Sequence, residues 1–139
     1  MIWHHKPELN ELNDRGLGNA VEHLGIIITE VQDNTLVATM PVDHRTRQPF
    51  GLLHGGASVL LAESVGSLAA NFVVDPEKAY CVGMEINANH LKAVKSGLVT
   101  AKAIAIHLGK KTQVWEIKIY NENNQLICIS RLTVAVIEK

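Results

Sequence analysis

The sequence has 139 residues, of which 47% are apolar and 19% charged, and its net charge is −1 at pH 7. These values are typical of a single globular domain with a hydrophobic core, spanning residues 1–139. The near-neutral charge and an aromatic content of 4% argue against a nucleic-acid-binding protein. Cys81 and Cys128 are isolated thiols, which favours a reduced, cytoplasmic protein, although two cysteines could also pair.

Residues 1–24 predict a short helical lead-in. Residues 7–15 are polar and favour a short helix that ends at Gly16 or Gly18. Asn19 is placed to cap a second short turn over residues 20–24. The first residues contain no apolar core of the kind found in signal peptides, so we expect no secretory leader.

A β-hairpin is predicted next. Residues 26–31 are rich in β-branched side chains, the pair Asp33-Asn34 is a turn signal, and residues 36–42 favour a second strand. A polar loop over residues 43–53 then leads into the long apolar segment that dominates the chain. We therefore expect the hairpin to be joined by this loop to a buried helix.

The segment from Gly55 to Val74 predicts a long helix that is apolar nearly all round, which is typical of a buried helix. Glu63 is the one side chain in it that ionises near neutral pH. Burying a carboxylate without a partner is costly, so Glu63 is either neutralised by a structural partner or retained for chemistry. Because His54 and Glu63 interrupt the apolar stretch, we expect no membrane span.

The remainder of the chain is strand-like after Asp75-Pro76-Glu77 ends the helix. Turn-forming residues separate four segments, namely 80–91, 98–108, 112–121 and 126–137. Four successive strands with short connections predict an antiparallel meander. One sheet can bury the long helix only by curling around it, so we expect an α+β domain. A single helix leaves apolar sheet surface uncovered, which favours a homodimer and a dimer of dimers.

Three segments resemble the hotdog-fold acyl-CoA thioesterases. They are residues 48–67, which contain HGG and a glutamate eight residues after Gly55, then MEINANHLK at 84–92 and HLGKKTQVWEI at 107–117. The resemblance extends from about Leu17 to Ile137. It is strongest to the branch with 4-hydroxybenzoyl-CoA thioesterases that carry a helix glutamate, phenylacetate-pathway thioesterases and 1,4-dihydroxy-2-naphthoyl-CoA hydrolases. It implies a hotdog fold and hydrolysis of aryl- or acyl-CoA, with dihydroxynaphthoyl-CoA of menaquinone synthesis as the leading candidate.

Five residues are the candidate catalytic group. The Gly55 amide at the helix N-terminus is suited to stabilise an oxyanion, and Glu63 is suited to act as nucleophile or general base. Ser67, four residues after Glu63, would orient that carboxylate or a water molecule. Gln48 would hydrogen-bond the thioester oxygen or position Glu63. His54 would shape the site or contact the acyl group, without acting as acid or base. Each of three residues also has a structural alternative. Gly55 could simply allow tight packing, Gln48 could be a solvated loop amide, and Ser67 could be a small residue that suits packing.

Coenzyme A needs cations and polar groups along its length. His90, Lys92, Lys110 and Lys111 lie near strand ends and a turn, where they are suited to phosphates, although solvated lysines are the alternative. The resemblance implies that the pantetheine path is lined by further residues: Val82, Asn89, Leu91, Ile106, His107, Leu108 and Gly109. The remaining histidines show no ligand spacing, so we expect no metal, and no cofactor beyond the coenzyme A of the substrate.

Helix geometry favours a site shared between subunits. Gly55 and Glu63 are eight residues apart, which separates their backbones by about 12 Å along a helix axis. Two antiparallel helices across a two-fold axis would bring Gly55 of one chain to Glu63 of the other. One competing function is a hotdog hydratase or dehydratase, whose histidine precedes a proline-rich segment, whereas His54 precedes Gly-Gly-Ala. The other is a non-catalytic acyl-CoA-binding protein, which would not need this set of polar residues.

Overall fold

The computed structural model describes all residues from 1 to 139 and contains three helices and six strands. In chain order the elements are α1 (Leu9–Asp14), α2 (Ala20–His23), β1 (Ile27–Val31), β2 (Thr35–Pro41), α3 (Gly55–Val73), β3 (Ala79–His90), β4 (Leu98–Leu108), β5 (Thr112–Tyr120) and β6 (Leu126–Glu138). Each predicted helix and strand is present, with bounds that differ from the sequence-based ones by one or a few residues.

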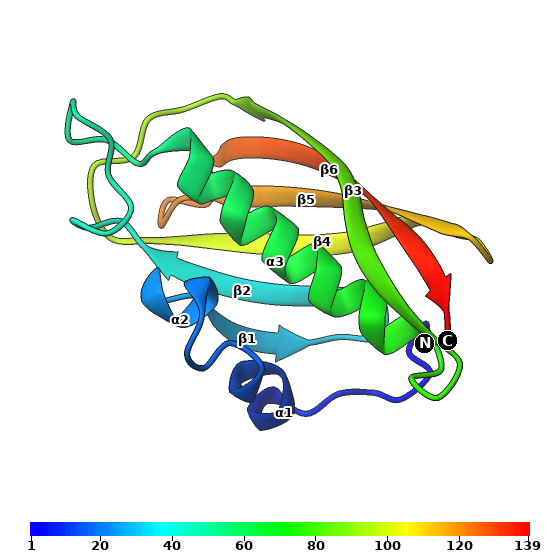
Figure 1. The fold of residues 1–139 in the computed structure, drawn as a ribbon. Helices are drawn as coiled ribbons and strands as arrows, with labels where there is room; N and C mark the ends of the chain where they lie inside the picture. The colour runs from blue at the N-terminus through cyan, green and yellow to red at the C-terminus, as the bar shows by residue number, and fades with distance from the viewer.

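The strands form one antiparallel sheet in the order β1-β2-β4-β5-β6-β3. The sheet curls around α3, which crosses its concave face, and β3 at one edge bends over the end of that helix (Figure 1). This is the α+β hotdog architecture that the sequence predicted, and the predicted hairpin is β1 with β2.

The predicted four-strand meander is wrong in the placement of its first strand, β3. β4, β5 and β6 do follow one another as a meander, but β3 pairs with β6 and not with β4. The connection over residues 91–97 therefore crosses the end of the sheet. It is held there because the Leu53 amide donates to the Val94 carbonyl at 2.8 Å, and Val94 itself is buried. Anchored in this way, the connection can pass β5 and β6 instead of making a hairpin.

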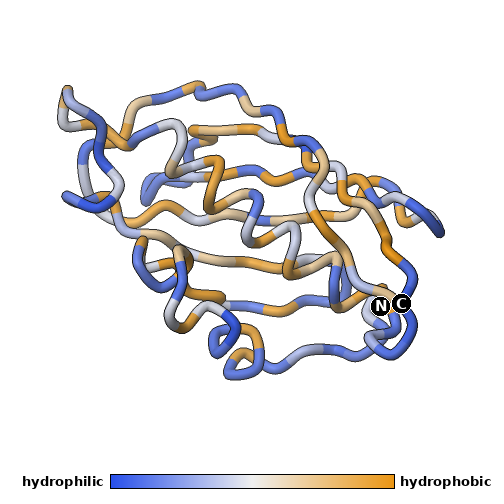
Figure 2. The backbone as a smooth tube through the Cα atoms, viewed as in Figure 1, coloured by the Kyte–Doolittle hydropathy of each residue, from blue (hydrophilic) through white to orange (hydrophobic).

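The core lies between α3 and the concave face of the sheet. Gly66 allows the close approach, because a Cβ atom there would lie 2.7 Å from Leu132 Cδ2 and 3.2 Å from Ile117 Cδ1. Apolar residues line the helix and the strands, and hydrophilic ones gather at the loops (Figure 2). β5 alternates between half-buried and buried positions, which confirms the wetter face predicted for that strand. By length and composition α3 could cross a membrane, but half of it is buried inside this fold.

The N-terminal lead-in packs on the outside of the sheet and helix. The Asn19 side chain caps α2 by accepting from the Val21 amide at 3.0 Å, as predicted. Trp3 is buried and donates from Nε1 to the Gln32 carbonyl at 2.7 Å. Both cysteines are buried and free, so the pairing alternative is wrong.

Candidate active site

The N-terminus of α3 leaves one backbone amide without an acceptor. His54 is the N-cap residue, and its Nδ1 accepts from the Gly56 amide at 2.7 Å. The His54 carbonyl accepts from the Ala57 and Ser58 amides at 3.0 and 3.2 Å. The Gly55 amide has no such partner, so it is free to bind an oxygen from outside the helix.

A small cavity of about 150 Å³ lies at this helix end and brings together several predicted residues. Its lining comprises Gln48, Leu53, Gly55, Ser58, His90, Lys92 and Ile127. The His90 ring covers the bare side of Gly55, because a Cβ atom on Gly55 would lie 2.7 Å from His90 Nε2. One pocket is thus lined by Gly55 with its free amide, by Gln48, and by two residues predicted to bind coenzyme A, His90 and Lys92.

The loop that carries Gln48 is held by polar contacts. The Arg45 guanidinium lies 2.7 Å from the Asp43 carboxylate, and its hydrogen bonds lower the pKa of Asp43 to about 2. Arg47 donates from its side chain to the Lys95 carbonyl at 3.0 and 3.1 Å, which ties the loop to the β3–β4 connection. The Gln48 Oε1 accepts from the Phe50 amide within the loop. These contacts position Gln48 at the mouth of the Gly55 pocket.

Glu63 is half-buried on α3 and lies outside that pocket. Its carboxylate rests against Gly83 of β3, where a Cβ atom would lie 2.5 Å from Glu63 Oε1. None of the ion pairs in the protein involves Glu63, and its oxygens are not sealed from solvent. No cationic partner therefore neutralises this carboxylate within the chain.

Ser67 lies one helical turn beyond Glu63, as its spacing predicted, but it lines a separate cavity. That cavity has a volume of about 150 Å³ and is bounded by Arg15, Gly16, Val21, Ser64, Ser67, Leu68 and Asn71. Asn71 fixes the adjacent strand, since its side chain both accepts from the Cys81 amide at 2.8 Å and donates to the Cys81 carbonyl at 3.0 Å.

The predicted residues divide into two groups along the sheet. Asn89, His90, Leu91 and Lys92 lie at the end of β3 near Gly55. Gly83, which lies against Glu63, pairs across the sheet with Val134 on β6, which pairs with Gln113 on β5, and Gln113 pairs with Leu108 on β4. The predicted residues 106–111 therefore lie toward the Glu63 end of the sheet. Gly83 and His90 are separated by roughly 20 Å of strand. One chain therefore does not bring all the predicted residues together.

Four polar residues beside these cavities were not predicted from the sequence, and Asn71, described above, is one of them. Ser58 is buried and lies one turn after Gly55, so a search at helical spacing from the HGG segment could have found it. Ser64 could have been found as the neighbour of Glu63. Arg15 lies in the N-terminal lead-in, and no local pattern connects it to α3.

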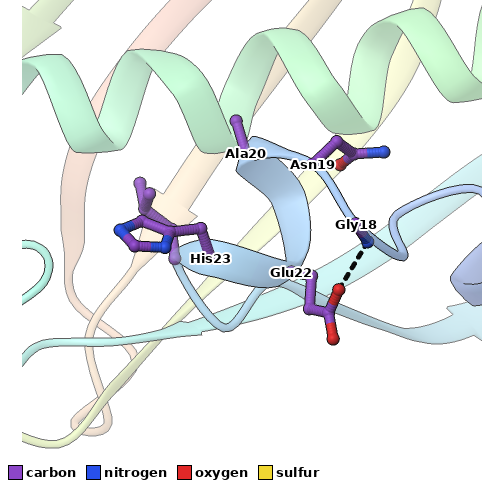
Figure 3. Close-up of a pocket in the computed structure, with 6 residues that line it drawn as sticks. Gly18, Asn19, Ala20, Glu22 and His23 are labelled. Carbon is purple, nitrogen blue, oxygen red and sulfur yellow. Dashed lines mark hydrogen bonds between the residues drawn. The ribbon is translucent and has the colours of Figure 1, made fainter.

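A larger depression than either of these cavities lies elsewhere. It measures about 650 Å³, surrounds α2 and is lined by Gly18, Asn19, Ala20, Glu22, His23 and Leu24. Figure 3 shows that the Glu22 carboxylate accepts from the Gly18 amide. None of the predicted site residues lies there, so size alone does not mark the reaction site. No group of three or more His, Cys, Asp or Glu side chains is arranged to hold a metal ion.

Comparison with known proteins finds thioesterases among those that this chain resembles. The chain is 51% identical to the 1,4-dihydroxy-2-naphthoyl-CoA hydrolase of Escherichia coli K12, over 99% of this chain and 100% of that protein. It is 48% identical to the proofreading thioesterase EntH of Cronobacter sakazakii, over 99% of each. A crystal structure of a mutant thioesterase from Pseudomonas aeruginosa superposes with a TM-score of 0.99 at 50% identity, covering 100% of both chains.

The family is established by a direct match as well as by these relatives. A profile described as the thioesterase superfamily, 4HBT, matches residues 50–128, which include α3 with Gly55 and Glu63 and most of the sheet. The match also favours hydrolysis over the hydratase and the non-catalytic alternatives. The chain belongs to the hotdog-fold thioesterase superfamily.

Proposed function

We propose that this thioesterase hydrolyses aryl- or acyl-CoA at sites that two copies of the chain build together. The observation that carries the proposal is the Glu63 carboxylate, which sits on an apolar helix with no ion-pair partner. A carboxylate that has no structural partner in such a place is available for chemistry.

The Gly55 amide supplies the electrostatic part of the mechanism. The free N–H and the positive end of the α3 dipole point to where the thioester oxygen gains negative charge as the carbonyl carbon is attacked. Loss of one such donor typically costs about 3–4 kcal/mol of transition-state stabilisation. Ser58 and Gln48 line the same pocket and add polar groups around the oxygen.

Glu63 supplies the attack by one of two routes. As a nucleophile it forms a mixed anhydride with the acyl group and expels the coenzyme A thiolate, and water then cleaves the anhydride. As a general base it takes a proton from a water molecule that adds to the carbonyl carbon. Each route consumes one water and yields the free acid and the coenzyme A thiol. Ser67, one turn away, would orient the carboxylate or the water.

The separation of the two groups supports a shared site. Gly55 and Glu63 lie about 12 Å apart along one helix, and Glu63 lies outside the Gly55 pocket. β3 is an edge strand with one unpaired side, and it exposes Val82 and Met84. Pairing with β3 of a second copy would run the two chains antiparallel and bring Gly55 of one toward Glu63 of the other.

The coenzyme A moiety would extend over both subunits. Lys92 and His90 lie on the Gly55 side, whereas Lys110 and Lys111 lie in the β4–β5 turn on the Glu63 side. Val82, Asn89, Leu91 and residues 106–109 stay predicted parts of the pantetheine path. We propose dihydroxynaphthoyl-CoA as substrate because of the similarity to the hydrolase from Escherichia coli, with a cytoplasmic location in keeping with two free thiols.

Release of free coenzyme A from a panel of acyl-CoA thioesters, followed with a thiol reagent, tests the proposal. The panel contains dihydroxynaphthoyl-CoA, benzoyl-CoA and straight-chain acyl-CoA. Glu63→Gln should lower kcat by orders of magnitude with little change in KM, because it removes the attacking group and keeps the shape. Glu116→Gln is the matched control, since Glu116 lies on β5 and pairs with Lys118 at 3.4 Å. Hydrolysis by Glu63→Gln at the wild-type kcat would refute the assignment.

A further inference from the structure

Ser58 is a buried serine whose hydroxyl has no hydrogen-bond partner within the chain. It is 2% exposed and lines the cavity that contains Gly55. No side-chain oxygen that is sealed from solvent lacks a partner in this protein, so the Ser58 hydroxyl opens into the cavity. A buried hydroxyl without a hydrogen bond costs free energy, which makes this one a group that the fold itself does not use.

The other buried polar residues all use their side chains within the fold. The Ser130 hydroxyl donates to the Ile117 carbonyl at 3.0 Å, and the remaining three are also hydrogen-bonded through their side chains, namely Thr35, Thr46 and Gln113. A helical serine can donate to the carbonyl four residues earlier. For Ser58 that carbonyl belongs to His54, and it already accepts from two backbone amides at 3.0 and 3.2 Å. Ser58 is therefore the buried polar residue that keeps a free donor.

Ser58 and Gly55 are neighbours on one side of the first turn of α3. Residues three apart in a helix have Cβ positions roughly 5–6 Å from each other. Helical side chains lean toward the N-terminus, so the Ser58 hydroxyl leans back toward Gly55. An oxygen atom between the Gly55 N–H and the Ser58 O–H would lie about 3 Å from each, which is the length of an ordinary hydrogen bond. The two donors can thus converge on one acceptor.

The remaining donors at this helix end are occupied. The Gly56 amide donates to His54 Nδ1 at 2.7 Å, and the next two amides donate to the His54 carbonyl. On the neighbouring loop, Gln48 Oε1 accepts from the Phe50 amide, which turns that end of the side chain back into the loop. The Gly55 N–H and the Ser58 O–H are thus the free donors of the first turn of α3, and both residues line one cavity.

We propose that the Ser58 hydroxyl is a second catalytic donor to the thioester oxygen, beside the Gly55 amide. The oxygen gains negative charge as the carbonyl carbon is attacked, so this hydrogen bond strengthens in the transition state and lowers the barrier. Ser58 keeps its proton throughout and forms no bond to the acyl group. This inference rests on the proposed hydrolysis at Glu63 and Gly55, and it adds a residue that acts on the oxygen.

The kinetic test separates a catalytic hydroxyl from a structural one. Ser58→Ala should lower kcat for benzoyl-CoA by roughly 100-fold, the usual effect of losing one oxyanion donor, with little change in KM. Its urea midpoint should not fall, because no hydrogen bond within the chain is lost. Ser130→Ala is the matched control, since it removes a buried hydroxyl that is bonded to the Ile117 carbonyl. That variant should lose stability and keep the wild-type kcat.

The spectroscopic test uses phenacyl-CoA, a ketone analogue that keeps a carbonyl but cannot be hydrolysed. With a ¹³C label, the carbonyl stretching frequency should fall on binding to the wild type, because donors polarise the bond, and should fall less in Ser58→Ala. An equal shift in both proteins, or a wild-type kcat in Ser58→Ala that is folded by circular dichroism, overturns the inference.

A second variant keeps the test decisive if Ser58→Ala does not fold. Ser58→Cys nearly preserves the size of the side chain and weakens the donor, so its kcat should also fall. A wild-type kcat in Ser58→Cys would then overturn the inference. Failure of the wild-type protein to hydrolyse any acyl-CoA would instead overturn the proposed function.

Discussion

A shared site predicts that two inactive chains restore activity when they are mixed. Glu63→Ala removes the attacking carboxylate, and Gln48→Ala alters the Gly55 pocket some 12 Å further along the helix. In a mixed dimer, one site combines the intact Gln48 of the first chain with the intact Glu63 of the second, and the other site carries both changes. Random pairing makes half of the dimers mixed, so activity should rise to roughly a quarter of the wild-type value.

The assay is coenzyme A release by an equal mixture of the two variants after they are unfolded and refolded together. Subunit exchange is verified independently by mass spectrometry of the native dimers, with one variant isotope-labelled. Each variant refolded alone provides the baseline. If mixed dimers form and the activity stays at the average of the two baselines, each site lies within one chain. The geometric reasoning from Gly55 and Glu63 would then be refuted.

Three further variants probe other contacts. Gly83→Ala would place a Cβ atom 2.5 Å from Glu63 Oε1, so it should displace the carboxylate and lower kcat while circular dichroism stays native; an unchanged kcat would contradict this. The double variant Lys110→Ala, Lys111→Ala should raise KM for acyl-CoA more than for an acyl-pantetheine thioester, which lacks the nucleotide. Equal effects on both substrates would show that these lysines are solvated and do not bind the phosphates. Burial raises the pKa of Cys81 from 9.0 to about 11, so the folded chain keeps a proton that the unfolded chain has lost. Unfolding free energy should therefore fall between pH 9 and pH 11, and by less in Cys81→Ala; equal pH dependence in both would contradict the burial argument.

The fold could be predicted largely from local patterns. The apolar helix with its single Glu63 and the alternation in β5 each carry enough signal in a short stretch of sequence. The pairing of β3 with β6 leaves no such local pattern in the sequence, because it depends on the path that the connection after β3 follows across the sheet. The seven-residue connection is long enough for either path, and contacts at Leu53 and Val94 decide it.

The candidate site divides in the same way. Gly55 and Gln48 were found because they lie within one continuous segment with Glu63, and the structure places the first two in one pocket. The unpaired state of Glu63 could not be known from the sequence, since it depends on what packs against the helix. Arg15 lies far from α3 in sequence and reaches it only through tertiary packing on Phe72.

The pairing of β3 with β6 also governs when the domain can be completed during synthesis. Partners in this ladder run from Ala79 with Glu138 to His90 with Cys128, so they are about 40 to 60 residues apart in sequence. β6 is the last of the six strands in chain order, and until it is synthesised β3 has no neighbour within the sheet. We expect closure of the sheet to be slow relative to formation of the β1–β2 hairpin. Chains truncated before β6 would expose β3 as an unpaired, partly apolar strand prone to aggregation.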